Sequence, residues 1–190
     1  MKKVLIVVDM QNDFIDGALG TKEAQAIVPN VKKKIEDYMT QGYDIVFTRD
    51  THQTNYLETM EGKKLPVEHC IEGTYGWEIS SELGDTMAHS IVDKPNFGYP
   101  HWVSCLSDFN VVEDEENWFN SYLDEEAPES IELVGLCTDI CVVSNALILK
   151  ALYPEVEITV DASCCAGVTP ESHKAALTTM KMCQVNVIGE

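Results

Sequence analysis

The sequence predicts an α/β fold: a Rossmann-like three-layer sandwich with a mainly parallel sheet of about six strands. Two observations support this prediction. Apolar runs of strand length alternate with helix-like segments along the whole chain, which is typical of a parallel sheet covered by helices on both faces. No linker, repeat or low-complexity tract divides the 190 residues, so we expect a single domain over residues 1–190.

The expected strands are short runs rich in aliphatic residues, and they lie at residues 3–9, 43–47, 90–93, 131–135, 155–160 and 185–188. The expected helices carry spaced apolar residues or few polar ones, and they lie at residues 27–41, 139–152 and 170–182. Gly42 marks a helix end, and Pro170 suits the first turn of the last helix. A further helical face is expected in the acidic segment 112–124, where the aromatic residues are Trp118, Phe119 and Tyr122.

Charge and composition exclude several classes of function. The chain has 13 Lys and Arg residues against 32 Asp and Glu residues, a formal charge of −19. Few cations can neutralise phosphates, which argues against nucleic acids and anionic membranes as partners. The first apolar run, residues 4–8, is too short to span a membrane and lacks a cleavage site of small residues. We therefore expect a cytoplasmic protein whose seven cysteines are reduced.

Several chemically active side chains follow the ends of expected strands. In open α/β sheets, sites form at the carboxyl ends of the strands, which meet at one edge. The residues that the sequence places at this edge are Asp9, Asp50, His52, Lys94, Cys137 and Cys141. An acid, a group of metal-ligating type, a cation and a thiol are thus expected together, which indicates an enzyme site.

Cys141 is the candidate nucleophile among the cysteines. It lies in a strand-to-helix turn, where unpaired N–H groups and the helix dipole favour a thiolate and can bind an oxyanion. Lys94 would supply a nearby cation, so we expect Cys141 to ionise easily. Asp9 is the candidate proton carrier; burial would raise its pKa and Lys94 would lower it, and the sequence does not decide between them. The structural alternatives are a small helix residue, a surface lysine paired with Asp93, and a turn-capping acid.

The motifs along nearly the whole chain resemble those of the isochorismatase-like cysteine hydrolases, and within them most closely those of nicotinamidases. The segments that carry the resemblance, in family order, are Val8–Phe14, Thr48–His52, Leu65–Cys70, Gly73–Gly76, Lys94 and Gly135–Cys141. The resemblance implies a catalytic triad of Cys141 as nucleophile, Asp9 as general base and then acid, and Lys94 as electrostatic partner. It also implies a cis peptide bond before Cys137, with the backbone N–H groups of Cys137 and Cys141 as an oxyanion hole.

Asp50, His52 and His69 form a candidate metal site. An Asp-x-His pair places both side chains on one side of an extended segment, and His69 can complete a site with oxygen and nitrogen ligands. The alternative is a pair of exposed loop histidines. The resemblance favours a metal and implies a fourth ligand in the intervening loop, for which Glu61 is our choice and Glu58 the alternative. Zn²⁺, Fe²⁺ or Mn²⁺ would suit this set, and no organic cofactor is expected.

The expected substrate contacts are Phe14, Leu65 and Phe97. Nicotinamidases place an aromatic residue on each side of the pyridine ring, and Phe14 matches one of them. The second position falls in the aliphatic stretch 65–67, so Phe97 or Tyr99 is expected to supply the missing contact. Trp77 and Trp102 are expected in the core or at an interface.

Together these features predict a cysteine amidohydrolase, with nicotinamide as the favoured substrate and a thioester intermediate. A second reading within the class is a metal-free hydrolase of an N-carbamoyl or ureido compound. A different class, a non-catalytic small-molecule or dinucleotide-binding module, is disfavoured because no G-x-G-x-x-G follows the first strand. The expected partner is a small amide, and a homo-oligomer remains open.

Overall fold

The computed structural model describes residues 3–106 and 127–190, and it contains a six-stranded sheet in which every pair of neighbouring strands is parallel. The strands are β1 (Lys3–Val8), β2 (Asp44–Asp50), β3 (Ser90–Lys94), β4 (Ser130–Leu136), β5 (Glu157–Ala166) and β6 (Asn186–Ile188). Their spatial order is β3-β2-β1-β4-β5-β6. The predicted α/β class is confirmed. The aromatic face expected in 112–124 lies outside the described residues.

The strand order reverses beside β1. The chain winds outward from β1 through β2 to β3, and then returns to the other side of β1 with β4. Connections on the two sides leave in opposite directions, so a crevice opens at the carboxyl ends of β1 and β4. This topology places the site between the two halves of the sheet.

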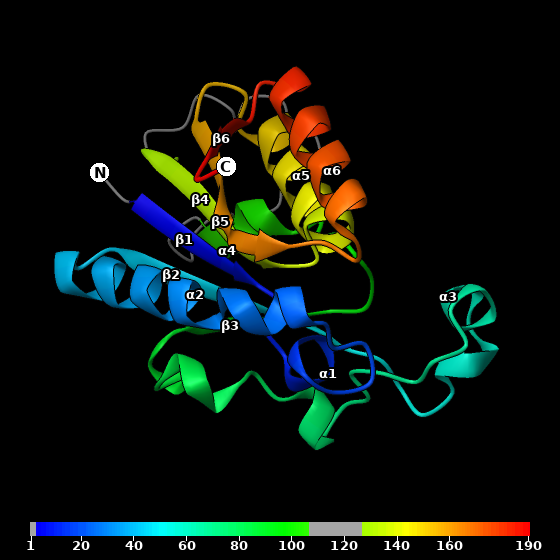
Figure 1. Cartoon of the computed structure of the whole chain (residues 1–190). Coiled ribbons are helices and arrows are strands. Elements are labelled where there is room, and N and C mark those ends of the chain that lie inside the picture. Colours follow the sequence, from blue (N-terminus) through cyan, green and yellow to red (C-terminus); the bar gives the residue numbers. More distant parts are fainter. Residues whose placement is uncertain (1–2, 107–126) are drawn as a thin grey trace.

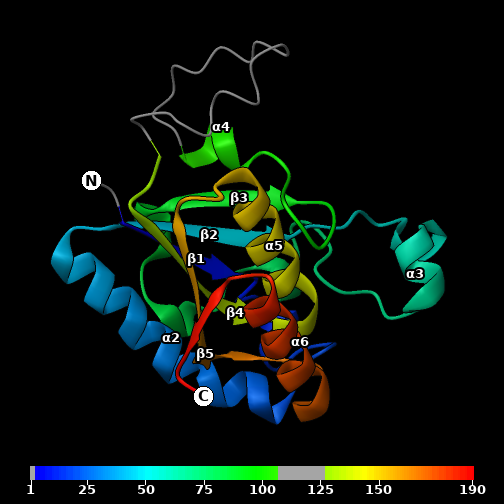
Figure 2. The ribbon, with the colours of Figure 1, turned by 90° about the horizontal axis from the view of Figure 1, so that it is seen from above.

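Helices cover both faces of the sheet (Figures 1 and 2). The helix α2 (Lys22–Gln41) lies on one face, and α5 (Val143–Leu152) and α6 (Pro170–Met182) lie on the other. Successive side chains of β1 alternate between these layers, because side chains of a strand point to opposite faces. Leu5 and Val7 pack with the buried face of α2, whereas Val4, Ile6 and Val8 pack with α5 and α6.

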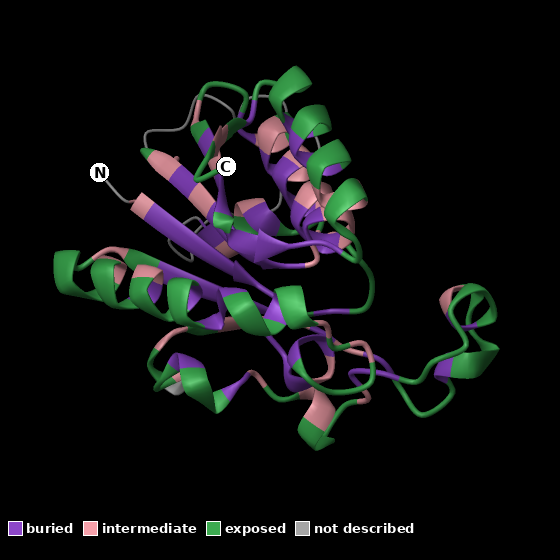
Figure 3. Cartoon of the chain, in the orientation of Figure 1, coloured by how far each residue is buried: buried purple, intermediate pink, exposed green. Residues whose placement is uncertain are grey.

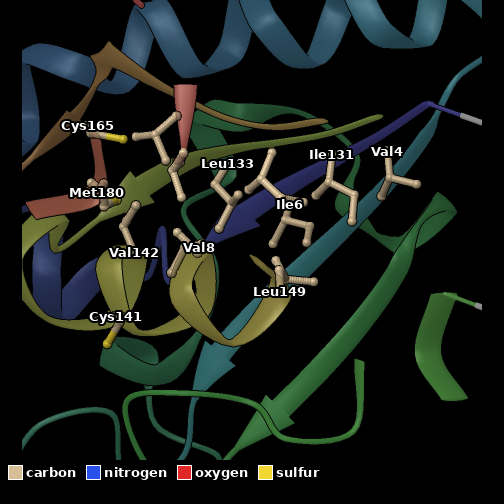
Figure 4. Close-up of a cluster of buried hydrophobic side chains, with 14 of the residues drawn as sticks. Val4, Ile6, Val8, Ile131, Leu133, Cys141, Val142, Leu149, Cys165 and Met180 are labelled. Atoms are coloured by element: carbon tan, nitrogen blue, oxygen red, sulfur yellow. The ribbon is translucent and has the colours of Figure 1, made fainter. Parts of the chain in front are cut away.

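The distribution of burial follows this layering (Figure 3). The sheet is buried through its centre, and the outer faces of the helices are exposed. Figure 4 shows Val4, Ile6 and Leu149 inside the cluster between the sheet and α5. Cys141 lies at the margin of the same cluster, with its sulfur directed away from the other labelled side chains.

Several elements extend beyond their predicted bounds. The helix predicted at 27–41 begins at Lys22, because Thr21 caps it by accepting a hydrogen bond from the N–H of Ala24 at 3.0 Å. Its apolar spacing starts later, at Ile27, so periodicity alone places the start too late. The strand β5 continues to Ala166 rather than ending at 160, because Asp161 pairs with Ile188 of β6, and Cys165 and Ala166 pair with Gly135 and Leu136 of β4.

Short helices and turns lie in the connections between these elements. The helix α1 (Asn12–Ile15) lies between β1 and α2, and α4 (Trp102–Leu106) lies after β3. Between β2 and β3 lie α3 (Met60–Lys64) and four 3₁₀ turns, η1 (Tyr56–Glu58), η2 (Tyr75–Trp77), η3 (Ser81–Leu83) and η4 (Thr86–Ala88). The polar stretch 50–76, in which the sequence shows little periodicity, contains α3 on a loop that extends from the sheet (Figure 1). Within the described ranges, the structure holds no helix long and apolar enough to cross a membrane.

Candidate active site

Four strand ends bring the predicted residues together, as the sequence predicts. Asp9 directly follows β1, Asp50 ends β2, Lys94 ends β3, and Cys141 lies in the turn after β4. Asp50 and Lys94 are partners in the register of β2 and β3, so their backbones lie side by side. Residues separated by up to 132 positions therefore meet because parallel strands share one carboxyl edge.

Lys94 is the centre of this group and is fully buried. Its Nζ lies 2.7 Å from Oδ2 of Asp9, 3.5 Å from Sγ of Cys141 and 3.3 Å from Oδ1 of Asp50. Burial favours the neutral amine, but the neighbouring carboxylates outweigh it and hold the pKa of Lys94 above its usual range. The alternative of a surface lysine paired with Asp93 is wrong: Asp93 forms a two-point ion pair with Arg49.

Asp9 is held in an unusual backbone conformation, with φ of +47°. Its N–H donates to Oγ1 of Thr48 at 3.2 Å, and its Oδ1 accepts from the same hydroxyl at 2.6 Å. Burial raises the pKa of Asp9, and this effect exceeds the opposite effect of Lys94 and of the Thr48 hydrogen bond. The structure thereby resolves a balance that the sequence leaves open. A carboxylate whose pKa is raised is a stronger base.

The expectation that Cys141 ionises easily is wrong for the protein without substrate. Burial raises the pKa of its thiol well above the usual value, and the negative charge of Asp9 raises it further. Lys94 acts in the opposite direction but is already paired with Asp9. The prediction considered only Lys94 and the helix N-terminus, both of which lower the pKa of Cys141. Desolvation and the carboxylate of Asp9 raise this pKa, and their effect is larger.

The turn that carries Cys141 has a special backbone. The peptide bond between Leu136 and Cys137 is cis, as the resemblance implies. Gly135 has φ of +117°, and a Cβ there would lie 2.1 Å from the carbonyl oxygen of Val8, so only glycine fits against β1. Cys141 itself lies in the π-helical turn η6 (Thr138–Val142), immediately before α5, rather than in a regular first α-helical turn.

Acidity does not distinguish Cys141 from Cys137. Burial raises the pKa of Cys137 to about 12, and the pKa of Cys141 is raised as well. The contact of Sγ of Cys141 with Nζ of Lys94 is what separates the two thiols. Cys137 packs instead with the apolar cluster on the α2 side of the sheet.

A second group of side chains lies beside Lys94. One potential ligand atom from each of Asp50, His52, Glu61 and His69 lies within 4.8 Å of the others. Nε2 of His52 is 2.9 Å from Oδ2 of Asp50 and 3.6 Å from Oε1 of Glu61. Nε2 of His69 is 3.6 Å and 3.8 Å from the same two oxygens. Both histidines are buried, so the alternative of two exposed loop histidines is wrong.

Local structure brings these distant residues into one place. The N–H of His52 donates to the carbonyl of Cys70 at 3.0 Å, which sets the His52 and His69 segments side by side. Thr59 caps α3, which carries Glu61 toward the histidines, and a Cβ on Gly62 would lie 2.2 Å from the carbonyl oxygen of Tyr56. The structure selects Glu61 for this group; Glu58 is exposed and is not part of it.

The donor set fits a divalent cation. Nε2 of His52 is buried, faces two carboxylates and makes no hydrogen bond of acceptable geometry within the described residues. His69 uses Nδ1 to bond the carbonyl of Val67 at 2.8 Å, which leaves Nε2 directed to the group. Burial alone would raise the pKa of Asp50, but the imidazoles and Lys94 outweigh it and hold this pKa well below its usual value. Two imidazoles and two carboxylates suit a transition-metal dication.

Sequence reasoning missed the residues that support these groups. The buried side chain of Gln11 accepts from the N–H of Asp50 at 2.7 Å and donates to its carbonyl at 2.8 Å. Tyr56 is fully buried, and its ring centroid lies 4.7 Å from that of His52 and 4.9 Å from that of His69. For Gln11, the sequence did offer a signal, because a glutamine stands two residues after the expected strand 3–9. No periodic pattern marks Tyr56.

Of the expected substrate contacts, Phe14 packs against a candidate metal ligand, whereas Leu65 and Phe97 are partly exposed. Phe14 is buried, with its ring centroid 5.5 Å from that of His69. Leu65 and Phe97 are exposed by 38% and 43%, respectively. Tyr99 packs edge-on against the buried Trp102, with 5.1 Å between ring centroids, so it belongs to the packing around α4.

The remaining tryptophan, Trp77, lies beside the strand ends. Its ring stacks on the guanidinium of Arg49, with 3.7 Å from Cζ to the ring centroid. Its indole N–H donates to Oγ1 of Thr51 at 2.8 Å. The default assignment of Trp102 to the core is confirmed, and Trp77 serves the packing of β2 against the η2 segment.

Comparison with known proteins agrees with this architecture. The sequence model of a family described as "Isochorismatase domain" matches residues 3–189. A nicotinamidase/pyrazinamidase of Mycobacterium tuberculosis is 28% identical over 200 residues, which cover 98% of each chain.

Solved structures show the same fold. A pyrazinamidase of Pyrococcus horikoshii, crystallised in complex with zinc, superposes with a TM-score of 0.77 at 24% identity and covers 100% of both chains. An N-carbamoylsarcosine amidase of Thermoplasma acidophilum superposes with a TM-score of 0.70 at 25% identity, over 99% of this chain and 96% of that one.

Proposed function

The chain belongs to the isochorismatase family, and from this premise we propose that it is a cysteine amidohydrolase that converts nicotinamide and water to nicotinate and ammonia. One observation carries the proposal. Nζ of Lys94 contacts both Oδ2 of Asp9, at 2.7 Å, and Sγ of Cys141, at 3.5 Å, and all three side chains are buried. A thiol, a base and a cation in mutual contact are the parts that acyl transfer requires.

The first half of the reaction forms a thioester. Asp9, whose pKa is raised by burial, takes the proton of the Cys141 thiol as the sulfur attacks the amide carbon. The carbonyl electron pair moves to oxygen, and the N–H groups of Cys137 and Cys141 hold this oxyanion. The C–N bond then breaks, Asp9 returns its proton to the nitrogen, and ammonia leaves.

The second half regenerates the thiol. Asp9, again a carboxylate, takes a proton from water as the water oxygen attacks the thioester carbon. The C–S bond breaks, the acid product forms, and Cys141 recovers its proton. Lys94 stays charged throughout and keeps one compensating positive charge beside the thiol and the carboxylate.

We assign Asp50, His52, Glu61 and His69 as the ligands of one divalent ion, Zn²⁺, Fe²⁺ or Mn²⁺. When bound, such an ion would supply a positive charge that attracts the ring nitrogen of a pyridine-type amide and so orients the substrate. Phe14, packed on His69, would contact one face of the ring. Phe97 and Leu65 are our candidates for the remaining substrate contacts.

Two alternatives remain. Similarity to the N-carbamoylsarcosine amidase of T. acidophilum supports a second substrate class, an N-carbamoyl or ureido compound hydrolysed without metal. A non-catalytic binding protein would instead bind the amide and leave it intact. A cytoplasmic location and a homo-oligomer stay predictions.

Ammonia release from a panel of amides tests the proposal. We expect turnover of nicotinamide and pyrazinamide, slower turnover of benzamide, which lacks the ring nitrogen, and loss of nicotinamide turnover with a chelator. Cys141→Ala should abolish turnover while the circular-dichroism spectrum and Tm remain those of a folded protein. Cys183→Ala, which changes an exposed cysteine, is the matched control and should be fully active.

Other outcomes would redirect the assignment. Chelator-insensitive hydrolysis of N-carbamoylsarcosine in preference to nicotinamide would favour the second substrate class. An active Cys141→Ala enzyme would end the proposed mechanism. Binding of nicotinamide by a metal-reconstituted protein that releases no ammonia would favour the non-catalytic alternative.

A further inference from the structure

A buried amide lies one helical turn after the candidate nucleophile. Asn145 is 0% exposed, and its side chain makes four hydrogen bonds. Oδ1 accepts from the N–H of Tyr99 at 2.9 Å and from Nε1 of Trp102 at 3.0 Å. Nδ2 donates to the carbonyl of Phe97 at 3.1 Å and to the carbonyl of Cys141 at 2.8 Å. These four bonds use both donors and both acceptor positions of the amide.

These bonds join two segments that carry different parts of the site. Three of them reach the loop 95–101 or the residue after it, and one returns to the turn that holds Cys141. The loop directly follows Lys94, and Nζ of Lys94 donates to the carbonyl of Asn96 at 3.1 Å. Adjacent carbonyls of this loop are therefore held from two sides, Asn96 by Lys94 and Phe97 by Asn145.

The loop also lies close against α5. A Cβ on Gly98 would come within 2.5 Å of Cδ1 of Ile148, one turn further along the helix. Gly98 and the side chain of Asn145 therefore fix the position of the same loop against α5. Phe97 is a candidate substrate contact, and the hydrogen bond from Asn145 to its backbone carbonyl fixes its position.

We propose that Asn145 is a positioning residue that sets the place of the Lys94 ammonium relative to Cys141. It does so by fixing the loop 95–101, and with it the Asn96 carbonyl, against the helix of the nucleophile. The catalytic consequence rests on the proposed function; the effect on the reactivity of the Cys141 thiol does not. A displacement of about 1 Å in such a group can cost on the order of a hundredfold in rate.

The variant Asn145→Ser cuts the loop contacts selectively. In the same helix, the hydroxyl of Ser144 donates to the carbonyl of Ile140, four residues earlier, at 2.6 Å. A serine at position 145 can make the equivalent bond to the carbonyl of Cys141, whereas its side chain is too short to hold the loop. Ser144→Ala is the matched control, because it removes a hydrogen bond within the same helix and leaves the four bonds of Asn145 in place.

The experiment measures both turnover and thiol reactivity in the full chain. Ammonia release from nicotinamide gives kcat and KM. Iodoacetamide labelling, followed by mass spectrometry of the peptide that contains Cys141, gives an alkylation rate that requires no substrate. The exposed Cys183 serves as an internal reference for the reagent.

For Asn145→Ser we expect kcat to fall about tenfold or more, with a smaller change in KM, and alkylation of Cys141 to slow at least about threefold. Ser144→Ala should match wild type in both. If Asn145→Ser has a lower Tm but wild-type kcat and alkylation rate, the residue is merely structural and the inference is wrong. If wild type hydrolyses no amide, the proposed function fails, and the alkylation rates still decide the role of Asn145.

A second variant covers the case in which Asn145→Ser does not fold. Trp102→Phe keeps a buried aromatic ring and removes one donor from Oδ1 of Asn145. We expect it to slow both kcat and alkylation in the same direction, by about twofold to fivefold. Wild-type values for both quantities in Trp102→Phe would contradict the inference.

Discussion

Nζ of Lys94 lies 3.3 Å from Oδ1 of Asp50, while Oδ2 of the same carboxylate lies 2.9 Å from Nε2 of His52. Asp50 therefore joins the two halves of the site: one oxygen faces the group of Asp9 and Cys141, and the other faces the candidate metal ligands. A charge introduced on either side of this carboxylate affects the groups on the other side, because Lys94, Asp50 and His52 are all buried.

Replacing Lys94 with Met should make Cys141 harder to ionise. The substitution keeps most of the side-chain volume but removes the cation that opposes burial and the charge of Asp9. The pKa of Cys141 should rise further, so the midpoint of its alkylation by iodoacetamide should move to higher pH. Removing one partner of a buried pair also leaves Asp9 uncompensated, which should cost about 3–5 kcal/mol of stability. An unchanged midpoint would show that Lys94 is not the partner of the thiolate.

Glu61→Gln should weaken metal binding, whereas Glu58→Gln should not. Of the two glutamates, Glu61 places a carboxylate oxygen beside Asp50, His52 and His69, whereas Glu58 is exposed. We expect nearly one Zn, Fe or Mn per chain for wild type by elemental analysis, and an affinity at least about tenfold weaker for Glu61→Gln. Glu58 has the same charge in the same loop and is the matched control. Equal metal affinities in the two variants would exclude Glu61 as a ligand.

Thr48→Val should shift the acid limb of the pH profile. The hydroxyl of Thr48 donates to Oδ1 of Asp9 at 2.6 Å and lowers the pKa of that carboxyl against the larger effect of burial. Without it the pKa of Asp9 rises, so a larger fraction of the base is protonated at any given pH on the acid side. The acid limb of kcat/KM should therefore move to higher pH. Thr40→Val changes an exposed threonine and should leave the acid limb of kcat/KM unchanged. An equal shift in Thr40→Val would contradict the role assigned to the hydrogen bond from Thr48 to Asp9.

Lys34→Met should destabilise the protein in a pH-dependent way. Nζ of Lys34 lies 2.6 Å from Glu132 and 2.8 Å from Asp161, between α2 and the sheet. Burial raises the pKa of Asp161, but the hydrogen bonds from Lys34 and Ser163 outweigh it, and the folded-state pKa is lowered. A carboxyl with a depressed folded pKa stabilises the protein above its unfolded pKa, and this stabilisation is lost as the pH falls through the folded pKa.

The measurement is urea unfolding of wild type and Lys34→Met between neutral and acidic pH. We expect a difference of about 2 kcal/mol at neutral pH, typical of a hydrogen-bonded partly buried charge, that shrinks below about pH 4. Lys181→Met is the control, because its ion pair with Glu190 is about half exposed and should contribute less than about 1 kcal/mol. A difference that stays constant with pH would contradict the linkage.

The sequence by itself was sufficient for the order of the elements and for the meeting of four strand ends. The aliphatic run of β1 ends at Asp9, and the equivalent ends at Lys94 and before Cys141 are visible as changes from apolar to polar residues. Because a parallel sheet brings such ends to one edge, residues far apart in the chain could be grouped without coordinates. Their identity as an acid, a cation and a thiol followed from the motifs.

Only the tertiary structure decided how those groups behave and what holds them. The sign of the pKa shift at Cys141 depends on desolvation and on the distance to Asp9, and neither is a local property of the turn. The sequence already favoured Glu61 over Glu58, but the position of the short helix α3 is what places Glu61 beside the two histidines. Three of the four bonds of Asn145 link a loop and a helix that are 43 to 48 residues apart. Burial and long-range hydrogen bonds come from the packing of whole elements, so no window of the sequence contains them.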